Sequence, residues 1–221
     1  MRTVVVTGGA KGIGKAVAER FADDRVEAGG RDMLDVTDEE AVAAFFERVG
    51  PVDVLVNNAG LAEGAPLART SLDSWRNHFE VNATGAFLCT RAVLPGMLER
   101  GEGRIVTVAS TAGLQGARYT TAYTAAKHAA VGLMRATAAE VAGTGVTANA
   151  VCPGWVRTAM MERAVERITA TTDRDEEQAE AALVAQMPLG RALEAEEVAE
   201  AVWFLASPGA AAVNGQALVL G

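Results

Sequence analysis

The chain has 221 residues, half of them hydrophobic, and a formal net charge of −8. This length suits one domain with a substantial buried core, and the acidic balance argues against a nucleic-acid partner, because neutralising phosphates requires clustered Lys and Arg. The apolar runs stay short of the ~18 residues of a membrane span, and Met1-Arg2 lead directly into a strand-like run, so we expect neither a membrane segment nor a signal peptide.

Strand-like apolar runs alternate with helical patterns along the whole chain. We expect strands at 3–7, 25–29, 52–57, 103–110, 147–152 and 217–220, and helices at 13–22, 39–49, 71–99, 123–142, within 159–185 and at 195–206. This alternation indicates βαβ units and a parallel sheet with helices on both faces. The sequence therefore predicts an α/β fold, a doubly wound parallel sheet, in a single domain spanning 1–221.

The connection after strand 25–29 is unusually short. Two adjacent parallel strands need a crossover of about a dozen residues or more, yet helix 39–49 follows almost at once, with Thr37 or Asp38 as its cap. We therefore expect one edge strand–helix unit to be shortened or missing. Asp35-Val36 would then reach the nucleotide end of the site directly from Arg31.

A glycine-rich turn joins the first strand to the first helix. It reads Thr7-Gly8-Gly9-Ala10-Lys11-Gly12-Ile13-Gly14. Glycine permits positive φ and a close approach of the backbone to a ligand, and a helix N-terminus favours phosphate groups. In this position the turn predicts a dinucleotide-binding site.

A second constellation has the chemistry of proton transfer. Ser110 ends strand 103–110, and Tyr123 and Lys127 follow on a helix, four residues apart and so on one face. A Lys ammonium beside a phenol is expected to lower the pKa of Tyr123 from its reference of about 10. The Ser110 hydroxyl is suited to hold a carbonyl oxygen. The spacing alone also fits a surface Tyr beside a solvated Lys, so the interpretation depends on the other motifs.

Polar and small residues accompany these motifs. Asn82 interrupts an apolar helix, where Asn is a poor residue, so we expect either a locally satisfied helix distortion or an anchor for a water near Tyr123 and Lys127. Asn57-Asn58-Ala59-Gly60 and Pro153-Gly154 each follow a strand, and small residues there leave room for a ligand.

Histidines and cysteines are few. His78 and His128 have no partner at ligand spacing, so we expect no catalytic metal. Cys89 and Cys152 lie in apolar segments and are expected to be buried free thiols, as in a reducing cytoplasm.

In their order and spacing these motifs resemble the short-chain dehydrogenase/reductase family over essentially the whole chain. Within the family, segments 101–116 and 151–158 are most similar to bacterial ketoreductases of fatty-acid and aromatic-polyketide synthesis, and segment 152–158 is also similar to 3-hydroxybutyrate dehydrogenases. The resemblance implies a homotetramer that transfers hydride between a nicotinamide cofactor and a carbonyl or secondary alcohol, and the free thiols predict a cytoplasmic location. The short connection near residue 31 departs from the family.

The resemblance also implies residue roles. Tyr123 would be the general acid or base, Lys127 would assist it and bind the nicotinamide ribose, Ser110 would hold the substrate oxygen, and Asn82 would anchor a water that links Lys127 to solvent. The implied cofactor-binding residues are Gly8, Lys11, Gly12, Ile13, Gly14, Arg31, Asp35, Val36, Asn58, Ala59, Gly60, Tyr123, Lys127, Pro153, Gly154, Val156 and Thr158.

Charges near the second strand bear on the cofactor. An NAD site carries an Asp or Glu after this strand, but the alignment puts Gly30 there, with Arg31 next to it and Lys11 in the glycine turn. We therefore expect NADP(H). NAD(H) stays an alternative, because Asp32 could take the acidic role.

The sequence favours a ketoreductase that acts on a small-molecule ketone or alcohol. The alternatives are an NAD-dependent dehydrogenase of a small hydroxy acid such as 3-hydroxybutyrate, and a dinucleotide-binding regulatory protein without turnover. We expect a substrate lid at 158–187, with Met160, Met161 and Val165 facing inward. Helix 123–142 is small and apolar around most of its circumference, so it needs burial on more than one side, which predicts an oligomer.

Overall fold

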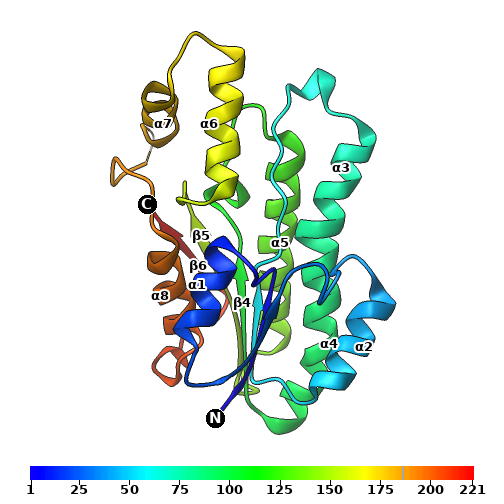
Figure 1. The fold of residues 1–221 in the computed structure, drawn as a ribbon. Coiled ribbons are helices and arrows are strands. Elements are labelled where there is room, and N and C mark those ends of the chain that lie inside the picture. The colour runs from blue at the N-terminus through cyan, green and yellow to red at the C-terminus, as the bar shows by residue number, and fades with distance from the viewer. Residues whose placement is uncertain (186) are drawn as a thin grey trace.

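The computed structural model describes residues 1–185 and 187–221, so one residue of the predicted lid, 186, lies outside the described part. A six-stranded parallel sheet has the order β2-β1-β3-β4-β5-β6 (Figure 1). The strands are β1 (Thr3–Thr7), β2 (Arg25–Gly29), β3 (Val54–Asn57), β4 (Gly103–Val108), β5 (Val146–Pro153) and β6 (Ala217–Leu220). The helices are α1 (Gly12–Arg20), α2 (Glu39–Val49), α3 (Leu72–Phe79), α4 (Gly85–Arg100), α5 (Thr121–Glu140), α6 (Ala159–Thr171), α7 (Glu176–Val184) and α8 (Ala195–Leu205).

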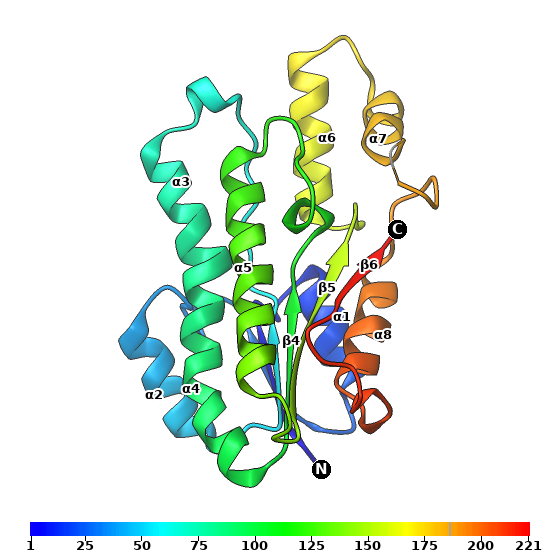
Figure 2. The same cartoon turned by 180° about the vertical axis from the view of Figure 1, so that it is seen from behind.

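Helices cover both faces of the sheet, as Figures 1 and 2 show from opposite sides. Side chains alternate between the two faces along each strand: Val4 and Val6 join the core under α1 and α8, whereas Val5 joins the core under α2, α4 and α5. The predicted doubly wound α/β fold is confirmed.

The short connection after β2 contains a turn and no strand. The N–H groups of Met33 and Leu34 both donate to the Gly30 carbonyl at 3.1 Å, and Leu34 and Val36 are buried in the core. Asp38 caps α2 by accepting from the Ala41 N–H at 3.0 Å. The predicted loss of one edge strand–helix unit is therefore confirmed, and β2 is left at the edge of the sheet.

Charged side chains line this edge strand. Glu27 pairs with Arg25 at 3.0 Å and with Arg48 at 3.9 Å. Charges on an edge strand discourage pairing with the sheet of another molecule. The β2 edge is thus poorly suited to strand addition.

The predicted helix 71–99 is wrong in one respect, because a π-turn at Glu80–Thr84 separates α3 from α4. Asn82 lies in this turn, and π-turns in helices often mark functional sites. The predicted strand 103–110 also ends earlier, at Val108, which leaves Ser110 in the turn that follows. The other predicted elements are present, and their ends differ from the predicted ones by a few residues at most.

Cys89 and Cys152 are both buried free thiols, as expected. Among the described residues, none of the helices is both long enough and apolar enough to cross a membrane.

Candidate active site

The carboxyl ends of β1, β3, β4 and β5 bring the predicted motifs to one edge of the sheet. The Asn58 side chain after β3 donates to the Thr7 and Gly8 carbonyls at 2.9 and 3.2 Å. A Cβ on Gly12 would lie 3.2 Å from Thr158 Cγ2, so the segment after β5 contacts the glycine turn. Ligands of open α/β sheets bind at this edge.

The glycine turn has the shape of a phosphate cradle. Gly8 and Gly12 have φ of +65° and +53°, which side chains disfavour. A Cβ on Gly14 would lie 2.4 Å from the Gly8 carbonyl oxygen and from Asn58 Nδ2. Helix α1 begins here and its N-cap, Lys11, forms no side-chain cap, so the first N–H groups of the helix stay available to an anion. These residues fit a dinucleotide pyrophosphate.

Two residues assigned to the cofactor have buried side chains. Val36 and Val156 are each 6% exposed with their side chains in the core, so only their main chains could face a nucleotide. The sequence placed Thr7 in the glycine-rich turn but gave it no role of its own, whereas in the structure its Oγ1 accepts from the N–H groups of Asn58 and Ala59 at 3.0 and 2.9 Å. Its position at the end of the first strand was the available signal.

Ser110, Tyr123 and Lys127 come together beside the end of β4. Ser110 Oγ accepts from the Ala112 N–H at 3.1 Å, so its own hydroxyl proton can be donated to the Tyr123 oxygen or to a substrate oxygen. Lys127 Nζ lies 5.8 Å from the centroid of the Tyr123 ring and donates to the Val108 carbonyl at 3.0 Å. The proton-transfer constellation predicted from sequence is thus assembled.

The electrostatics of this constellation differ from the expectation. Burial raises the pKa of the Tyr123 phenol, and the Ser110 hydroxyl only partly opposes the rise. Burial also lowers the pKa of Lys127 to about 8. The expected lowering of the Tyr123 pKa by Lys127 is therefore wrong here, because desolvation of the phenolate outweighs other effects. The Tyr123 phenol therefore stays protonated at neutral pH, the state in which it can act as a proton donor.

Asn82 is buried and its side chain is largely engaged. Nδ2 donates to the carbonyls of Leu61 and His78 at 2.9 and 3.0 Å, and Oδ1 accepts from the Leu61 N–H at 3.2 Å. A Cβ on Gly60 would lie 3.2 Å from Asn82 Oδ1 and 3.6 Å from Lys127 Nζ. Gly60 thus leaves space between these two polar atoms.

Arg31 and Lys11, the two cations that we relate to the choice between NADP(H) and NAD(H), lie in and beside the glycine turn. The Gly9 N–H donates to the Gly29 carbonyl at 2.8 Å, which places the end of β2 against this turn. Arg31 and Lys11 are exposed, and Arg31 pairs with Asp35 at 2.7 Å. Hydrogen bonds from Thr37, and next the Arg31 guanidinium, hold the pKa of Asp35 below its usual value.

Helices α6 and α7 extend beyond the carboxyl edge of the sheet (Figure 1). On α6, Met161 is buried, and Met160 and Val165 are partly buried. Arg167 reaches the opposite side, where a Cβ on Gly64 would lie 3.0 Å from its Nη1. This helix therefore contacts the segment that follows β3.

Within residues 1–185 and 187–221, His, Cys, Asp and Glu form no group of three or more that could hold a metal ion.

Comparisons with known proteins place the chain. A family model described as Enoyl-(Acyl carrier protein) reductase matches residues 26–220. A putative ketoacyl reductase of Streptomyces coelicolor is 45% identical over 223 residues, which cover 99% of this chain and 85% of the relative. A D-beta-hydroxybutyrate dehydrogenase of Cupriavidus necator is 35% identical over 242 residues, with 97% and 94% covered.

Among solved structures, the crystal structure of an actinorhodin polyketide ketoreductase variant with NADPH matches with a TM-score of 0.90 and 38% identity, covering 99% of this chain and 95% of that one. The sequence match, the order of the strands in the sheet and the grouping of Ser110, Tyr123 and Lys127 all indicate the same family. The chain belongs to the short-chain dehydrogenase/reductase family of oxidoreductases.

Proposed function

We propose that the protein is an NADPH-dependent ketoreductase. The observation that carries this proposal is the arrangement of Tyr123 beside the Ser110 hydroxyl, with Lys127 Nζ 5.8 Å from the centroid of its ring. A protonated phenol is the general acid that carbonyl reduction needs. The relatives described as ketoacyl reductases, and the NADPH in the similar ketoreductase structure, support the same direction.

The chain's own residues account for the proton side of the reaction. The cofactor, when bound, supplies hydride. Ser110 donates a hydrogen bond to the substrate oxygen as negative charge develops on it, and Tyr123 then gives that oxygen its proton. Lys127 places a positive charge beside Tyr123. A water in the space left by Gly60, held by Asn82 Oδ1, would return a proton toward Lys127.

The test is an assay of NADPH oxidation with ketoacyl thioesters, set against an assay of NAD⁺ reduction with 3-hydroxybutyrate. The similarity to a hydroxybutyrate dehydrogenase keeps the second activity as an alternative. Faster oxidation of 3-hydroxybutyrate would overturn the proposal. Dinucleotide binding without turnover on either panel would identify a regulatory protein, which a complete proton-transfer set argues against.

NADP(H) should bind more tightly than NAD(H). Arg31 and Lys11 are exposed cations beside the glycine turn, and a 2′-phosphate would share Arg31 with Asp35. Charge-assisted bonds of this kind are worth about 1.5–3 kcal/mol, so Arg31→Ala should reduce the preference in Kd by roughly tenfold or more. Titration by fluorescence measures both constants.

The control for this titration is Lys15→Ala, because Lys15 lies on α1 but pairs with Glu19. A wild type that prefers NAD(H) contradicts the assignment. A preference that survives the loss of both Arg31 and Lys11 contradicts it as well.

Reduction should weaken as the pH rises through about 8, where Lys127 loses its proton. Its ammonium is present below this pH and absent above it, so the charge beside Tyr123 disappears on the alkaline side. The measurement is kcat/KM for ketone reduction from about pH 6 to about pH 10. In Lys127→Arg, whose guanidinium stays charged, the alkaline decline should move upward; an unchanged profile would exclude Lys127 as its origin.

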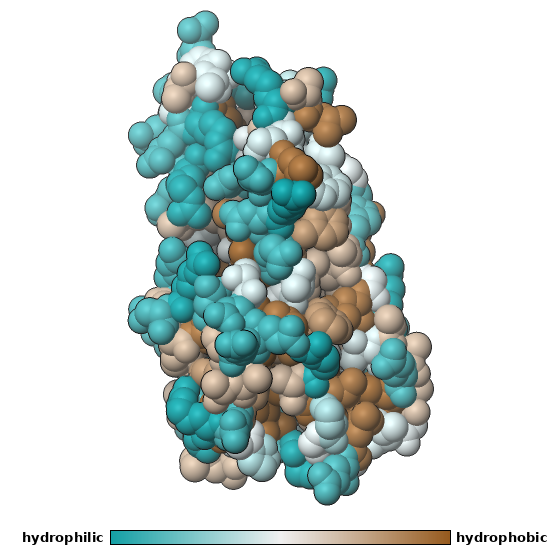
Figure 3. Space-filling model, turned by 90° about the vertical axis from the view of Figure 1, so that its right-hand side faces the viewer, coloured by the Kyte–Doolittle hydropathy of each residue, from teal (hydrophilic) through white to brown (hydrophobic). Residues whose placement is uncertain are grey.

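We propose a homotetramer built on α4 and α5. Phe87 and Leu98 on α4 are 42% and 41% exposed, and α5 runs beside α4 (Figure 2) with exposed Ala136 and Ala139. Figure 3 shows apolar residues among polar ones on the face that carries α3 and α4. Burial of this surface across a two-fold axis fits a closed assembly. Light scattering that gave a monomer at micromolar concentration would refute it.

We also propose that 158–187 acts as a lid over the substrate. Pro153-Gly154 and Pro188-Leu189-Gly190 bracket the segment as hinges, and Met161 supplies an apolar ceiling. Hydrogen exchange in this segment should slow when cofactor and ketone are bound together.

We propose in addition that the protein is cytoplasmic. The buried free thiols Cys89 and Cys152 suit a reducing compartment, and cell fractionation would test the location.

A further inference from the structure

His78 is a fully buried histidine that the proposed mechanism does not use. Its side chain is 0% exposed, in the last turn of α3. Nδ1 lies 2.7 Å from the Ser74 carbonyl oxygen, and Nε2 accepts from the Glu63 N–H at 3.1 Å. Because a carbonyl only accepts, these partners assign the proton to Nδ1 and leave Nε2 as the acceptor. The ring thus serves as a neutral, two-ended hydrogen-bonding group.

His78 and Asn82 hold the same segment. Asn82 binds both the N–H and the carbonyl of Leu61, and His78 binds the N–H of Glu63. Asn82 Nδ2 also donates to the His78 carbonyl at 3.0 Å, so the two residues are linked across the π-turn. Three main-chain groups between Leu61 and Glu63 are therefore fixed by two buried side chains.

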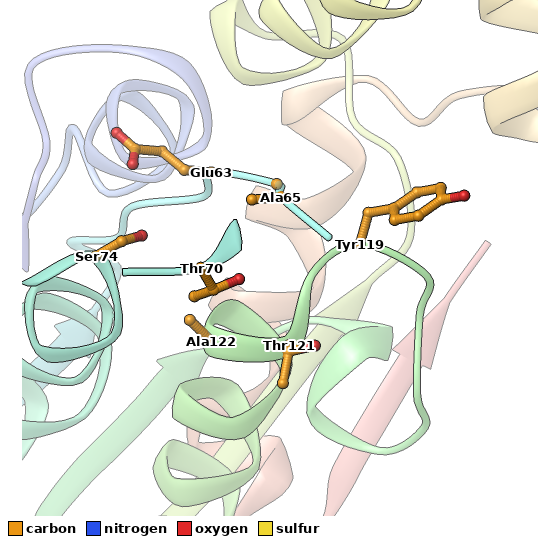
Figure 4. A pocket seen from close by; sticks show the side chains of 8 residues that line it. Glu63, Ala65, Thr70, Ser74, Tyr119, Thr121 and Ala122 are labelled. Atoms are coloured by element: carbon orange, nitrogen blue, oxygen red, sulfur yellow. The ribbon is translucent and has the colours of Figure 1, made fainter. Parts of the chain in front are cut away.

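The other end of this segment is attached to the entrance of α5. The Ala65 N–H donates to the Tyr119 carbonyl at 2.7 Å, and Ala65 forms an isolated β-bridge with Thr120. Tyr119 has φ of +65°, a strained conformation for an aromatic residue. In Figure 4, Glu63 and Ala65 of this segment lie along one side of a pocket of about 60 Å³, opposite Ser74 of α3 and Thr121-Ala122 at the start of α5.

The segment also borders the reacting groups. It begins after Gly60, which faces Lys127 Nζ, and Arg167 of α6 contacts it at Gly64. The His78 ring packs edge-on against the Tyr123 ring, with centroids 6.4 Å apart. The 61–65 segment is thus tied through His78 to the helix that precedes the π-turn, beside Tyr123.

We propose that His78 is a positioning residue that fixes the 61–65 segment as a wall of the substrate cleft and so sets the affinity for the ketone. The effect on the KM for the ketone rests on the proposed ketoreductase function. Its structural part, the clamping of Leu61 and Glu63, does not depend on the substrate. An apolar residue at 78 would leave the Glu63 N–H without its side-chain acceptor, while the Ser74 carbonyl would keep only its bond within the helix, and the segment would no longer be held at Glu63.

The experiment compares His78→Leu with His78→Gln, whose amide offers both a donor and an acceptor. In His78→Leu we expect KM for the ketone to rise at least ~10-fold with kcat changed less than ~3-fold, and exchange of the Glu63 amide to accelerate at least ~10-fold. His78→Gln should recover most of both effects. His128→Leu is the control, because the other histidine is exposed on α5 and should change neither readout.

Each outcome decides the proposal. A folded His78→Leu with wild-type KM and wild-type exchange overturns it, and so does a Gln variant that performs no better than Leu. If His78→Leu does not fold, exchange in the wild type decides, since a Glu63 amide that exchanges as fast as an exposed loop amide also overturns it. If no ketone is reduced by the wild type, the proposed function fails, but the exchange results still test the clamp.

Discussion

Replacing Tyr123 by Phe should lower kcat for ketone reduction by at least ~10²-fold, the low end for general acid catalysis. The phenyl ring keeps its edge-on packing against His78, 6.4 Å away between centroids, so the fold and the cofactor cradle stay intact. Only the hydroxyl beside Ser110 is lost, and with it the proton donor that the proposed mechanism assigns. The measurement is the rate of NADPH oxidation at saturating ketone, together with the Kd for NADPH, which should stay near the wild-type value.

The chain offers a matched control for this variant. Its only other tyrosine is Tyr119, which is 60% exposed and contributes its main-chain carbonyl rather than its hydroxyl to the site. Tyr119→Phe should therefore keep kcat near the wild-type value. Near-normal turnover in Tyr123→Phe would show that the proton comes from elsewhere, and the assigned mechanism would be wrong.

The architecture could be predicted because it rests on local rules. Apolar runs alternating with helical patterns specify a parallel sheet, and the absence of a crossover between Gly29 and Asp38 excludes another strand–helix unit there. The structure fills the gap with a turn anchored by Leu34 and Val36 in the core. The glycine turn and the Ser110, Tyr123 and Lys127 set were likewise predictable, since each depends on residue type and spacing.

What the sequence could not predict depends on contacts between distant segments. The π-turn at Glu80–Thr84 lets Asn82 reach Leu61, a partner 21 residues away. The pKa of Tyr123 depends on how deeply the phenol is buried, and Lys127 is diverted to the Val108 carbonyl. His78 looked unremarkable because its hydrogen-bonding partner Glu63 is far from it in sequence and offers only a main-chain group.

Replacing Gly14 by Ala should disrupt the dinucleotide cradle. The new Cβ would lie 2.4 Å from the Gly8 carbonyl oxygen and 2.4 Å from Asn58 Nδ2, and the first of these belongs to the backbone and cannot swing away. The glycine turn must shift, which breaks the hydrogen bond from Asn58 to Gly8. Overpacking of this kind costs about 1–3 kcal/mol, so Tm should fall by roughly 2–12 °C.

The same substitution should weaken NADPH binding, because the shifted turn no longer presents the start of α1 to the pyrophosphate. If the full cost appeared in binding, Kd would rise roughly 5- to 150-fold. Gly96→Ala is the matched control: Gly96 lies within α4, and the nearest atom to its Cβ would be the end of the Arg100 side chain at 3.3 Å. Alanine there should be neutral or stabilising, by up to about 1 kcal/mol. A Gly14→Ala protein with the Tm and NADPH affinity of the wild type would mean that the cofactor is held elsewhere. The added Cβ must displace the glycine turn, so a cofactor bound by this turn would lose affinity.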